Sequence, residues 1–242
     1  MHRFTHSTES RLTYSQCSFL ETFEVLVGTA PEQKLFTVHR DIATKRSGFF
    51  RAAKSGRWTQ TKSTDLQEHD PDTFNRYLHC LYRNAVPEHI LPPATLDKES
   101  FEQYVANVKH SADRQFEYLV DLYILANSLI DPITANMAIA KIRRFGRIKG
   151  YSPGAKVIDR VFRSTREDDG LRNLLADCHI YNLYVQYDGD FPKDFLFLVL
   201  RRFQQAKMDE NVTFDEDHIQ ELDGNGPYTL GQYFQKLEQS AE

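Results

Sequence analysis

The fold is decided by one stretch of the chain, Lys34-Leu-Phe-Thr-Val-His39-Arg-Asp-Ile-Ala-Thr-Lys-Arg-Ser47-Gly-Phe-Phe50. It begins with apolar residues in alternation, which predicts a strand over Leu35–Val38. From His39 the apolar period changes to three or four residues, which predicts a short helix. Gly48 interrupts this helix, and a second short helix is expected over Phe49–Lys54. The stretch therefore predicts a strand that leads directly into a tight helical corner.

Two further strands are expected around this stretch. Phe23–Val27 is a short run rich in β-branched residues that stops at Gly28, which predicts a strand. The loop at 29–33 would join it to Leu35–Val38 as a hairpin. Thr64–Leu66 is a candidate for a third, short strand. We therefore expect an α+β protein in which a small three-stranded sheet packs on a cluster of helices.

The first strong helix begins at Asp70-Pro71-Asp72, which combines a capping aspartate, a proline in the first helical position and another acid in the first turn. Its apolar residues recur with helical spacing and predict an amphipathic helix that ends near Asn84. They are Phe74, Tyr77, Leu78, Leu81 and Tyr82.

More helices are expected towards the C-terminus. The region at about 86–113 contains Pro92-Pro93 and is interpreted as a surface insertion, with a short helix at Phe101–Val108. A second strong helix has its apolar face on Phe116, Leu119, Val120, Tyr123, Ile124, Asn127 and Ile130. Asp131-Pro132 repeats the cap signal. The remaining helices are expected at 133–148, 156–162, 171–187 and 192–208.

Composition narrows the class of protein. The net charge of −4 does not point to nucleic acid. Three cysteines without disulfide or metal spacing indicate reduced thiols in the cytoplasm or nucleus. The longest apolar run, Phe195–Leu200, is far short of the roughly 20 residues that span a bilayer. We expect a flexible N-terminus at 1–19, a domain at 20–150, a helical extension at 151–208 and an acidic tail at 209–242.

This order of elements resembles the BTB/POZ domain, and the resemblance covers about residues 20 to 148. The matching residues are Val25-Leu-Val-Gly28, Phe36-Thr-Val-His39-Arg40, Ser47-Gly-Phe-Phe50, Leu66, Asp70-Pro71, Phe74, Leu81-Tyr82 and Leu122-Tyr-Ile-Leu-Ala126. The long insertion and the helical extension look like fungal proteins of this family. We interpret His39 as structural, with a buried imidazole that bonds backbone groups freed where the strand ends. Phe50 is expected in the core.

The resemblance implies a non-enzymatic module for protein–protein interaction. Dimer-forming members of the family carry an aspartate at the start of the first strand and a basic residue after the histidine, which together line a charged groove. In this chain the basic residue is Arg40, but Thr22 stands at the aspartate position. The resemblance therefore does not favour homodimerisation.

The second activity that the resemblance implies is binding of a cullin-3 scaffold, as a substrate adaptor of a ubiquitin ligase. The family contact is a hydrophobic residue, any residue and then glutamate, and here it reads Trp58-Thr59-Gln60. Trp58 would serve as an anchor, or it would simply cover the edge of the core. Gln60 keeps the shape of glutamate without its charge. The alternative function is an oligomerising scaffold or transcription-linked protein without a ubiquitin role.

Other clusters have plainer interpretations. The basic group Lys141, Arg143, Arg144, Arg147 and Lys149 is a candidate nucleic-acid patch, but it also fits a solvated helix end, where cations are favoured. Glu167-Asp-Asp169 suggests either a metal site or a charged start to the next helix. We find no catalytic constellation in the sequence, and we expect no enzyme activity, no cofactor and no metal.

Overall fold

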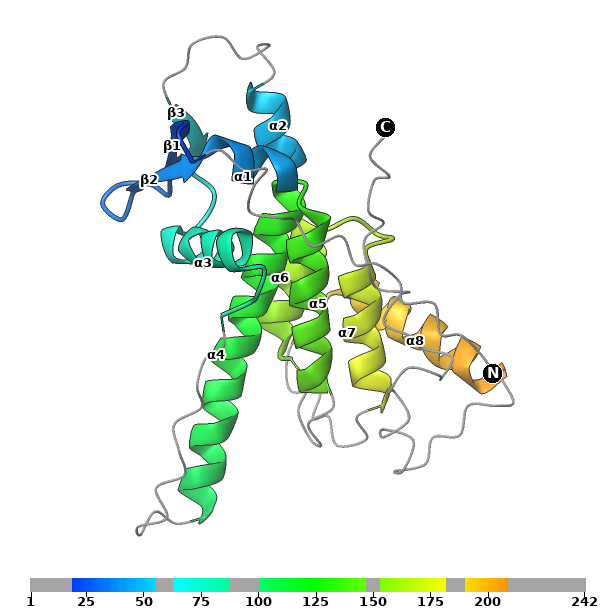
Figure 1. Cartoon of the computed structure of the whole chain (residues 1–242). Helices are drawn as coiled ribbons and strands as arrows, with labels where there is room; N and C mark the ends of the chain where they lie inside the picture. Colours follow the sequence, from blue (N-terminus) through cyan, green and yellow to red (C-terminus); the bar gives the residue numbers. More distant parts are fainter. Residues whose placement is uncertain (1–18, 55–62, 88–100, 147–152, 182–189, 209–242) are drawn as a thin grey trace, which may run out of the picture.

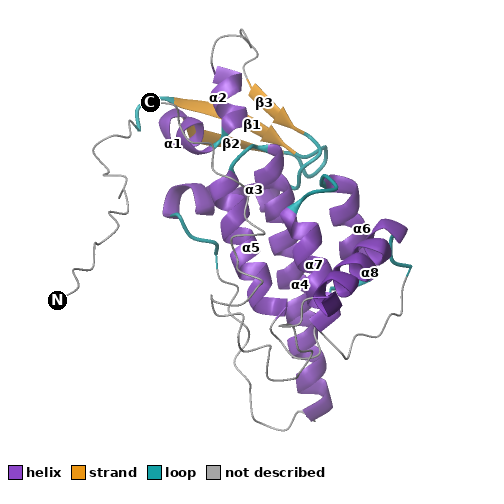
Figure 2. Ribbon diagram, turned by 90° about the vertical axis from the view of Figure 1, so that its right-hand side faces the viewer, coloured by secondary structure: helices purple, strands orange, loops and turns teal. Residues whose placement is uncertain are grey.

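The structure, a computed structural model, describes residues 19–54, 63–87, 101–146, 153–181 and 190–208. A small sheet and two short helices lie at one end of the molecule, and a cluster of longer helices lies beneath them (Figure 1 and Figure 2). The predicted α+β class is confirmed in this form: a three-stranded sheet near the N-terminus, followed by helices.

The sheet is mixed, with strand order β2-β1-β3. The central strand, β1 (Thr22–Val27), pairs antiparallel with β2 (Lys34–His39) and parallel with β3 (Ser63–Leu66). Alternate side chains of β1 are buried, as expected of a strand with one face on a core. All three predicted strands are therefore present, each within two residues of its expected bounds.

Aromatic side chains join the inner face of the sheet to the helices. The Phe36 ring on β2 lies 5.0 Å from that of Phe74, and the Phe23 ring on β1 lies 5.3 Å from that of Phe50. These centroid separations are typical of favourable aromatic pairs. Phe50 and Phe74 are fully buried, so the core position expected for Phe50 is confirmed, and Phe74 joins it between the sheet and the helices.

The helical corner predicted after the sheet is formed by α1 (Arg40–Arg46) and α2 (Gly48–Lys54). After β3, α3 (Pro71–Arg83) begins with the predicted cap: Asp70 Oδ2 accepts hydrogen bonds from the backbone N–H of Thr73 at 2.7 Å and from its hydroxyl at 2.9 Å. The helix ends at Asn84, which adopts the left-handed conformation common at this position.

The break expected between the short helix at Phe101–Val108 and the later helix is wrong, because α4 (Phe101–Ser128) is one continuous helix of 28 residues that starts where the short helix was expected. It includes the C-terminal part of the region assigned to a surface insertion. No proline or glycine occurs between its ends, so nothing in the local sequence stops it. Once a helix is nucleated, each further residue adds one hydrogen bond, and a polar run is accommodated without a break.

The cluster continues with α5 (Pro132–Gly146), α6 (Ala155–Ser164), α7 (Gly170–Tyr181) and α8 (Lys193–Met208). Helix α5 packs along α4, and α8 packs on α6 and α7. Ion pairs join two pairs of helices: Asp121 of α4 with Arg160 of α6 at 2.7 Å, and Asp177 of α7 with Arg202 of α8 at 2.5 Å. Across the described ranges, every helix is too short or too polar to cross a bilayer.

The packing of α8 on α7 predicts a loss of stability in acid. Burial lowers the pKa of His179, against a smaller opposing effect of the Leu175 carbonyl, which contacts its Nδ1 at 2.8 Å. As the pH falls, His179 therefore binds a proton at a higher pH in the unfolded chain than in the folded one. The stabilisation is complete above about pH 6.5 and is lost as the pH falls towards the lowered pKa, by up to about 1.4 kcal/mol per pH unit.

Urea unfolding between pH 7.5 and 5 checks this expectation, with His179→Gln expected to flatten the slope. Burial also lowers the pKa of His69, so part of the slope remains in that variant. The control is His79→Gln, which replaces an exposed histidine on α3 and should keep the wild-type slope. A wild-type slope in His179→Gln would contradict the prediction.

Candidate protein-interaction site

The corner between α1 and α2 is docked on the turn between α4 and α5. Ser47 is fully buried, donates from Oγ to the Leu129 carbonyl at 2.6 Å and accepts from the Phe50 amide at 3.1 Å. The amide of Gly48 donates to the Ile130 carbonyl at 3.0 Å. The first amides of a helix have no partner inside it. Carbonyls of the turn and the Ser47 hydroxyl satisfy them here.

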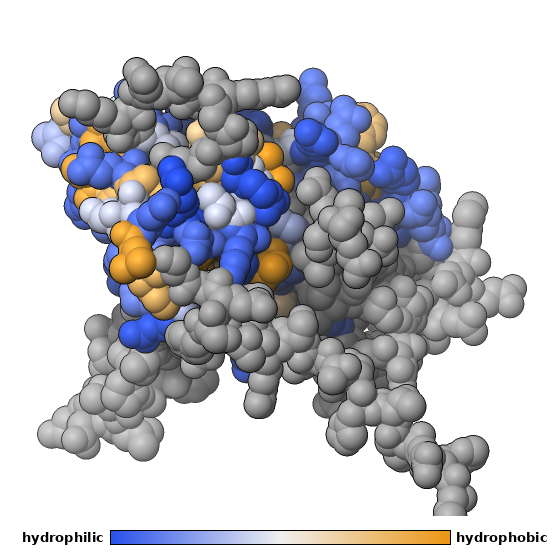
Figure 3. All heavy atoms as spheres, turned by 45° about the horizontal axis from the view of Figure 1, so that its top comes forward, coloured by the Kyte–Doolittle hydropathy of each residue, from blue (hydrophilic) through white to orange (hydrophobic). Residues whose placement is uncertain are grey.

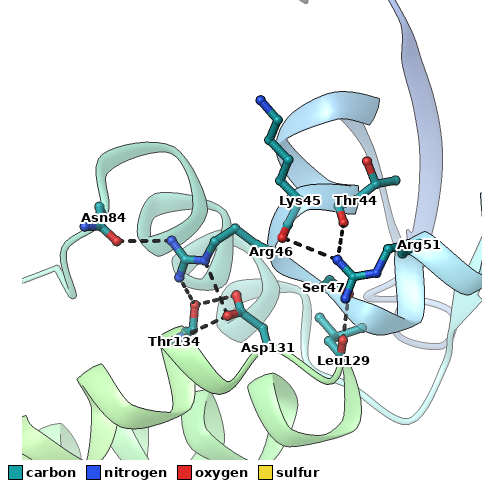
Figure 4. Close-up of polar contacts among 9 residues, drawn as sticks. All are labelled: Thr44, Lys45, Arg46, Ser47, Arg51, Asn84, Leu129, Asp131 and Thr134. Carbon is teal, nitrogen blue, oxygen red and sulfur yellow. Dashed lines mark hydrogen bonds and ion pairs between the residues drawn. The ribbon is translucent and has the colours of Figure 1, made fainter. Parts of the chain in front are cut away.

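Arg46, the last residue of α1, forms the centre of this contact (Figure 4). Its guanidinium donates to Asp131 Oδ1 at 3.4 Å, to Thr134 Oγ1 at 2.9 Å and to Asn84 Oδ1 at 3.1 Å. The Arg46 side chain is 9% exposed and that of Asp131 is fully buried. Arg46 thus joins α1 to the end of α3 and the start of α5. We call Arg46, Asp131, Thr134 and Asn84 the corner network.

Asp131 has a second role as the cap of α5. Its Oδ1 accepts from the backbone N–H of Thr134 at 3.1 Å, and its Oδ2 accepts from the Thr134 hydroxyl at 2.7 Å. The cap predicted from Asp131-Pro132 is therefore confirmed. Because this carboxylate also faces Arg46, one buried group both starts a helix and neutralises a cation.

Ionisable groups near the corner network are in their unreactive forms. Burial raises the pKa of Tyr77 well above its usual range; the charge of Asp131 adds to this effect and that of Arg46 opposes it. Burial also raises the pKa of the Cys80 thiol to about 12. Only a thiolate is a good nucleophile, so Cys80 acts as a small core residue.

Ile130 lies at the surface of the corner in an unusual conformation. The sequence pattern placed it on the apolar face of a helix, but that placement is wrong: α4 ends at Ser128, and Ile130 has φ 52° and is 53% exposed. A β-branched residue with positive φ is strained. Pro132 and the cap at Asp131 force the chain to reverse here. Ile133 is exposed nearby, so we call Ile130 and Ile133 the turn patch.

A methyl group at Gly48 should destabilise the corner. A Cβ there would lie 2.9 Å from Ile130 Cγ2 and 3.1 Å from its Cβ, which is too close. We expect Gly48→Ala to lower the free energy of unfolding by about 1–3 kcal/mol. Gly154→Ala is the control, because no atom lies within 4 Å of that Cβ. Urea unfolding measures both, and adding Ile130→Asn, which removes Cγ2 but keeps Cβ, should recover part of the Gly48→Ala loss. Equal losses in the two alanine variants would contradict the prediction.

His39 and Tyr82, two of the expected structural residues, contact each other. The Tyr82 hydroxyl accepts from the backbone N–H of His39 at 3.1 Å and lies 2.9 Å from its Nδ1. Since the hydroxyl oxygen already accepts, its proton is available to the ring nitrogen. The imidazole is half-buried, so the expectation of a buried ring bonded to backbone groups is wrong. A side chain 43 residues away fills that role.

Arg40 has an acidic partner in Glu21, the residue just before β1. The family resemblance placed the acidic position one residue later, at Thr22. Thr22 pairs with His39 across the strands. The Arg40 guanidinium instead contacts Glu21 at 2.9 Å, and both side chains are about half exposed. The Arg40 amide also donates to the Glu21 carbonyl at 2.8 Å. An exposed pair of this kind contributes at most about 1 kcal/mol.

Trp58, Thr59 and Gln60 lie outside the described residues. The elements on either side are placed: α2 ends at Lys54, and β3 starts at Ser63 on the edge of the sheet. Gly48, at the other end of α2, contacts Ile130. Seven helical residues span about 10 Å. We call the residues between Lys54 and Ser63 the Trp58 segment. The turn patch and the start of this segment are therefore separated by about the length of α2.

The sequence matches no known family model and no curated protein.

In the remaining candidate clusters, the described residues have separate environments and roles. In the basic group, Arg143 is buried while Arg144 is exposed; Arg147 and Lys149 lie outside the described residues. Asp169 starts α7, where its Oδ1 accepts from the Leu171 amide at 2.8 Å, so the charged-start interpretation holds. Within the described ranges, no three metal-ligating side chains gather.

Sequence reasoning missed Arg46 and misplaced Ile130. Arg46 is 85 residues from Asp131, and no local pattern links them. For Ile130 a signal did exist, because Asp131-Pro132 predicts the start of a new helix. Proline disfavours a helical conformation at the residue before it, so this signal places the end of the preceding helix before Asp131.

Proposed function

We propose that this chain is a non-enzymatic protein–protein interaction module with the BTB/POZ fold, and that it acts as a substrate adaptor for a cullin-3-type ubiquitin ligase. The observation that carries the proposal is the turn patch on its rigid support. Ile130 is strained and exposed, and the buried corner network holds it in place. Strained residues persist where the surrounding structure imposes them, and they concentrate at functional sites.

The arrangement of the corner suits a partner that binds across α2. The turn patch lies at its N-terminal end, and the Trp58 segment leaves from its C-terminal end. A stable interface buries about 800 Å² on each partner, so one interface is large enough to include both ends of α2. On the face that Figure 3 presents, apolar side chains emerge in separate groups among hydrophilic ones. Interfaces commonly have this mixed composition.

The chemistry of the described residues also favours binding over catalysis. Burial raises the pKa of both Cys80 and Cys178 to about 12, which leaves both thiols protonated. Asp70, Asp131 and Asp169 cap helices. Asp121 and Asp177 pair with arginines. These polar groups act in folding, while the exposed apolar groups remain available to a partner.

A binding assay with the cullin-3 scaffold tests the proposal on the full chain. We expect the wild type to bind and Trp58→Ala to weaken binding by about 30-fold or more, which corresponds to the hot-spot threshold of about 2 kcal/mol. Gln60→Glu should tighten binding, because a charged hydrogen bond contributes about 1.5–3 kcal/mol and a neutral one about 1. Absence of wild-type binding at about 100 μM would overturn the adaptor form of the proposal.

Ile130→Asn tests the turn patch separately. It loses part of a half-exposed apolar side chain but relieves about 1–2 kcal/mol of strain, so folding should change little. Binding should weaken by about fivefold or more, within the range of an ordinary contact residue. Leu35→Ser is the control, since Leu35 is exposed on β2, the far edge strand from β3. Equal binding by the two variants would remove the turn patch from the interface.

The second candidate function, a homo-oligomerising scaffold without a ubiquitin role, is favoured by the start of β1. Arg40 has an acidic partner in Glu21, and the neighbouring Phe19 and Leu20 are exposed. Light scattering at increasing concentration separates the two functions. A dimer that Leu20→Ser returns to monomer would support the scaffold, and a monomer at high concentration would count against it.

A further inference from the structure

Helix α8 has two apolar faces. The inner face packs on α6 and α7 through Phe195 and Leu198, which are buried, and through the Arg202–Asp177 ion pair. The outer face carries a second row of large apolar side chains. Leu196 is 40% exposed, Leu200 57% and Phe203 36%, and Phe197 beside them is 69% exposed.

This row has the geometry of a docking surface. Leu196, Leu200 and Phe203 are spaced i, i+4 and i+7, so they lie along one side of the helix. We call these three residues and Phe197 the α8 stripe. Single exposed apolar residues are ordinary on a protein surface, but contiguous rows mark interaction sites. The α8 stripe therefore fits a second amphipathic segment.

The chain itself contains a segment with matching properties, beginning directly after α8. Residues 209–242 carry nine acidic residues and one lysine, whereas α8 has four basic residues and one acidic residue. Two of these basic residues, Lys193 and Arg201, are exposed. Oppositely charged surfaces attract and favour one relative orientation.

The apolar residues of this segment follow the same period. Leu230, Tyr233, Phe234 and Leu237 are spaced i, i+3, i+4 and i+7. The linker between Met208 and Leu230 is 21 residues, which can reach about 70 Å when extended. The α8 stripe spans only about 10 Å along its helix. The linker is therefore more than long enough for the return.

We propose that the acidic C-terminal segment folds back on α8 and that Leu230, Tyr233, Phe234 and Leu237 cover the α8 stripe. Tethering makes this an intramolecular contact with an effective concentration in the millimolar range. The chain's own segment therefore has an advantage over a separate partner of equal affinity. This inference rests on α8 and is independent of the proposed ligase role.

Disulfide trapping in the full chain tests the contact. Cys80 and Cys178 are buried, so a Cys17→Ser background leaves the introduced cysteines as the reactive pair. We expect Leu200→Cys with Phe234→Cys to form an intrachain disulfide about tenfold faster than Leu200→Cys with Thr213→Cys. The control cysteine is nearer along the chain, so random tethered collisions would favour the control pair.

The possible results decide between the occupants of the α8 stripe. An intrachain bond that favours Phe234→Cys supports the proposal. A rate equal to or below that of the Thr213→Cys control overturns it. A bond that forms mainly between two chains also overturns it, and identifies a second copy as the occupant.

A labelling experiment checks the same contact without trapping. In the Cys17→Ser background, Leu200→Cys should react with a maleimide about tenfold more slowly than when Tyr233→Ser and Phe234→Ser are added. That ratio corresponds to a docking free energy of about 1.4 kcal/mol. Circular dichroism confirms that the variants keep their helices. Equal labelling rates in folded variants would contradict the proposal.

Discussion

Replacing Asp131 with alanine is expected to lower the free energy of unfolding by about 3–5 kcal/mol. The variant leaves the guanidinium of Arg46, only 9% exposed, without its carboxylate. It also removes the cap of α5 and the acceptor for the Thr134 hydroxyl. An unpaired buried charge is far more costly than a lost surface contact, because the protein no longer compensates for its lost hydration.

Urea unfolding measures this loss, and Asp159→Ala is the matched control. Asp159 pairs with Arg163 at 2.9 Å on the surface of α6, where an i,i+4 pair contributes about 0.3–0.5 kcal/mol. The double variant Arg46→Ala/Asp131→Ala should lose less than the sum of the single losses, since removing both partners leaves no unpaired charge. Similar losses for Asp131→Ala and Asp159→Ala would contradict the role of the corner network.

Replacing Phe195 with alanine is expected to cost about 3–5 kcal/mol. The side chain is fully buried where α8 meets α6 and α7. Its ring lies 4.9 Å from His179, 5.4 Å from Phe191 and 5.7 Å from Phe162. The loss combines the transfer of the aromatic ring to water with the cavity that it leaves among these rings.

Phe197→Ala is the control for this change. Both variants shorten a phenylalanine of α8 to alanine, but the Phe197 side chain is 69% exposed. We expect it to cost less than about 1.5 kcal/mol, since less apolar area returns to water. Hydrogen exchange of the α8 amides should rise in Phe195→Ala and change little in Phe197→Ala. Equal costs would mean that α8 is not anchored through its inner face.

Much of the fold was predictable because its signals are local. The alternation around Phe36 and Val38 and the Asp-Pro caps at Asp70 and Asp131 each act within a few residues. These predictions are confirmed. The start of α4 at Phe101 was expected, but its continuation beyond Val108 was not predictable from the same kind of signal. A polar run without proline or glycine is compatible with either a loop or an exposed helix.

The site was less predictable than the fold. Arg40 was identified as one half of a charged pair, but its partner is Glu21 rather than a residue at the Thr22 position. Tyr82 and His39 were both singled out, yet their contact spans 43 residues. The segment with Trp58 remains a prediction. Sequence patterns identify which residues matter more reliably than they identify which residues meet.

The sequence by itself determined the three strands, the helical corner and the capped helices, because periodicity and capping arise from neighbours along the chain. Only the tertiary structure decided that Arg46 would be buried against Asp131 and that Ile130 would face solvent. Those outcomes depend on how α1, α3 and α5 converge in space. Burial and charge pairing across such distances are properties of the packed molecule, and no local pattern encodes them.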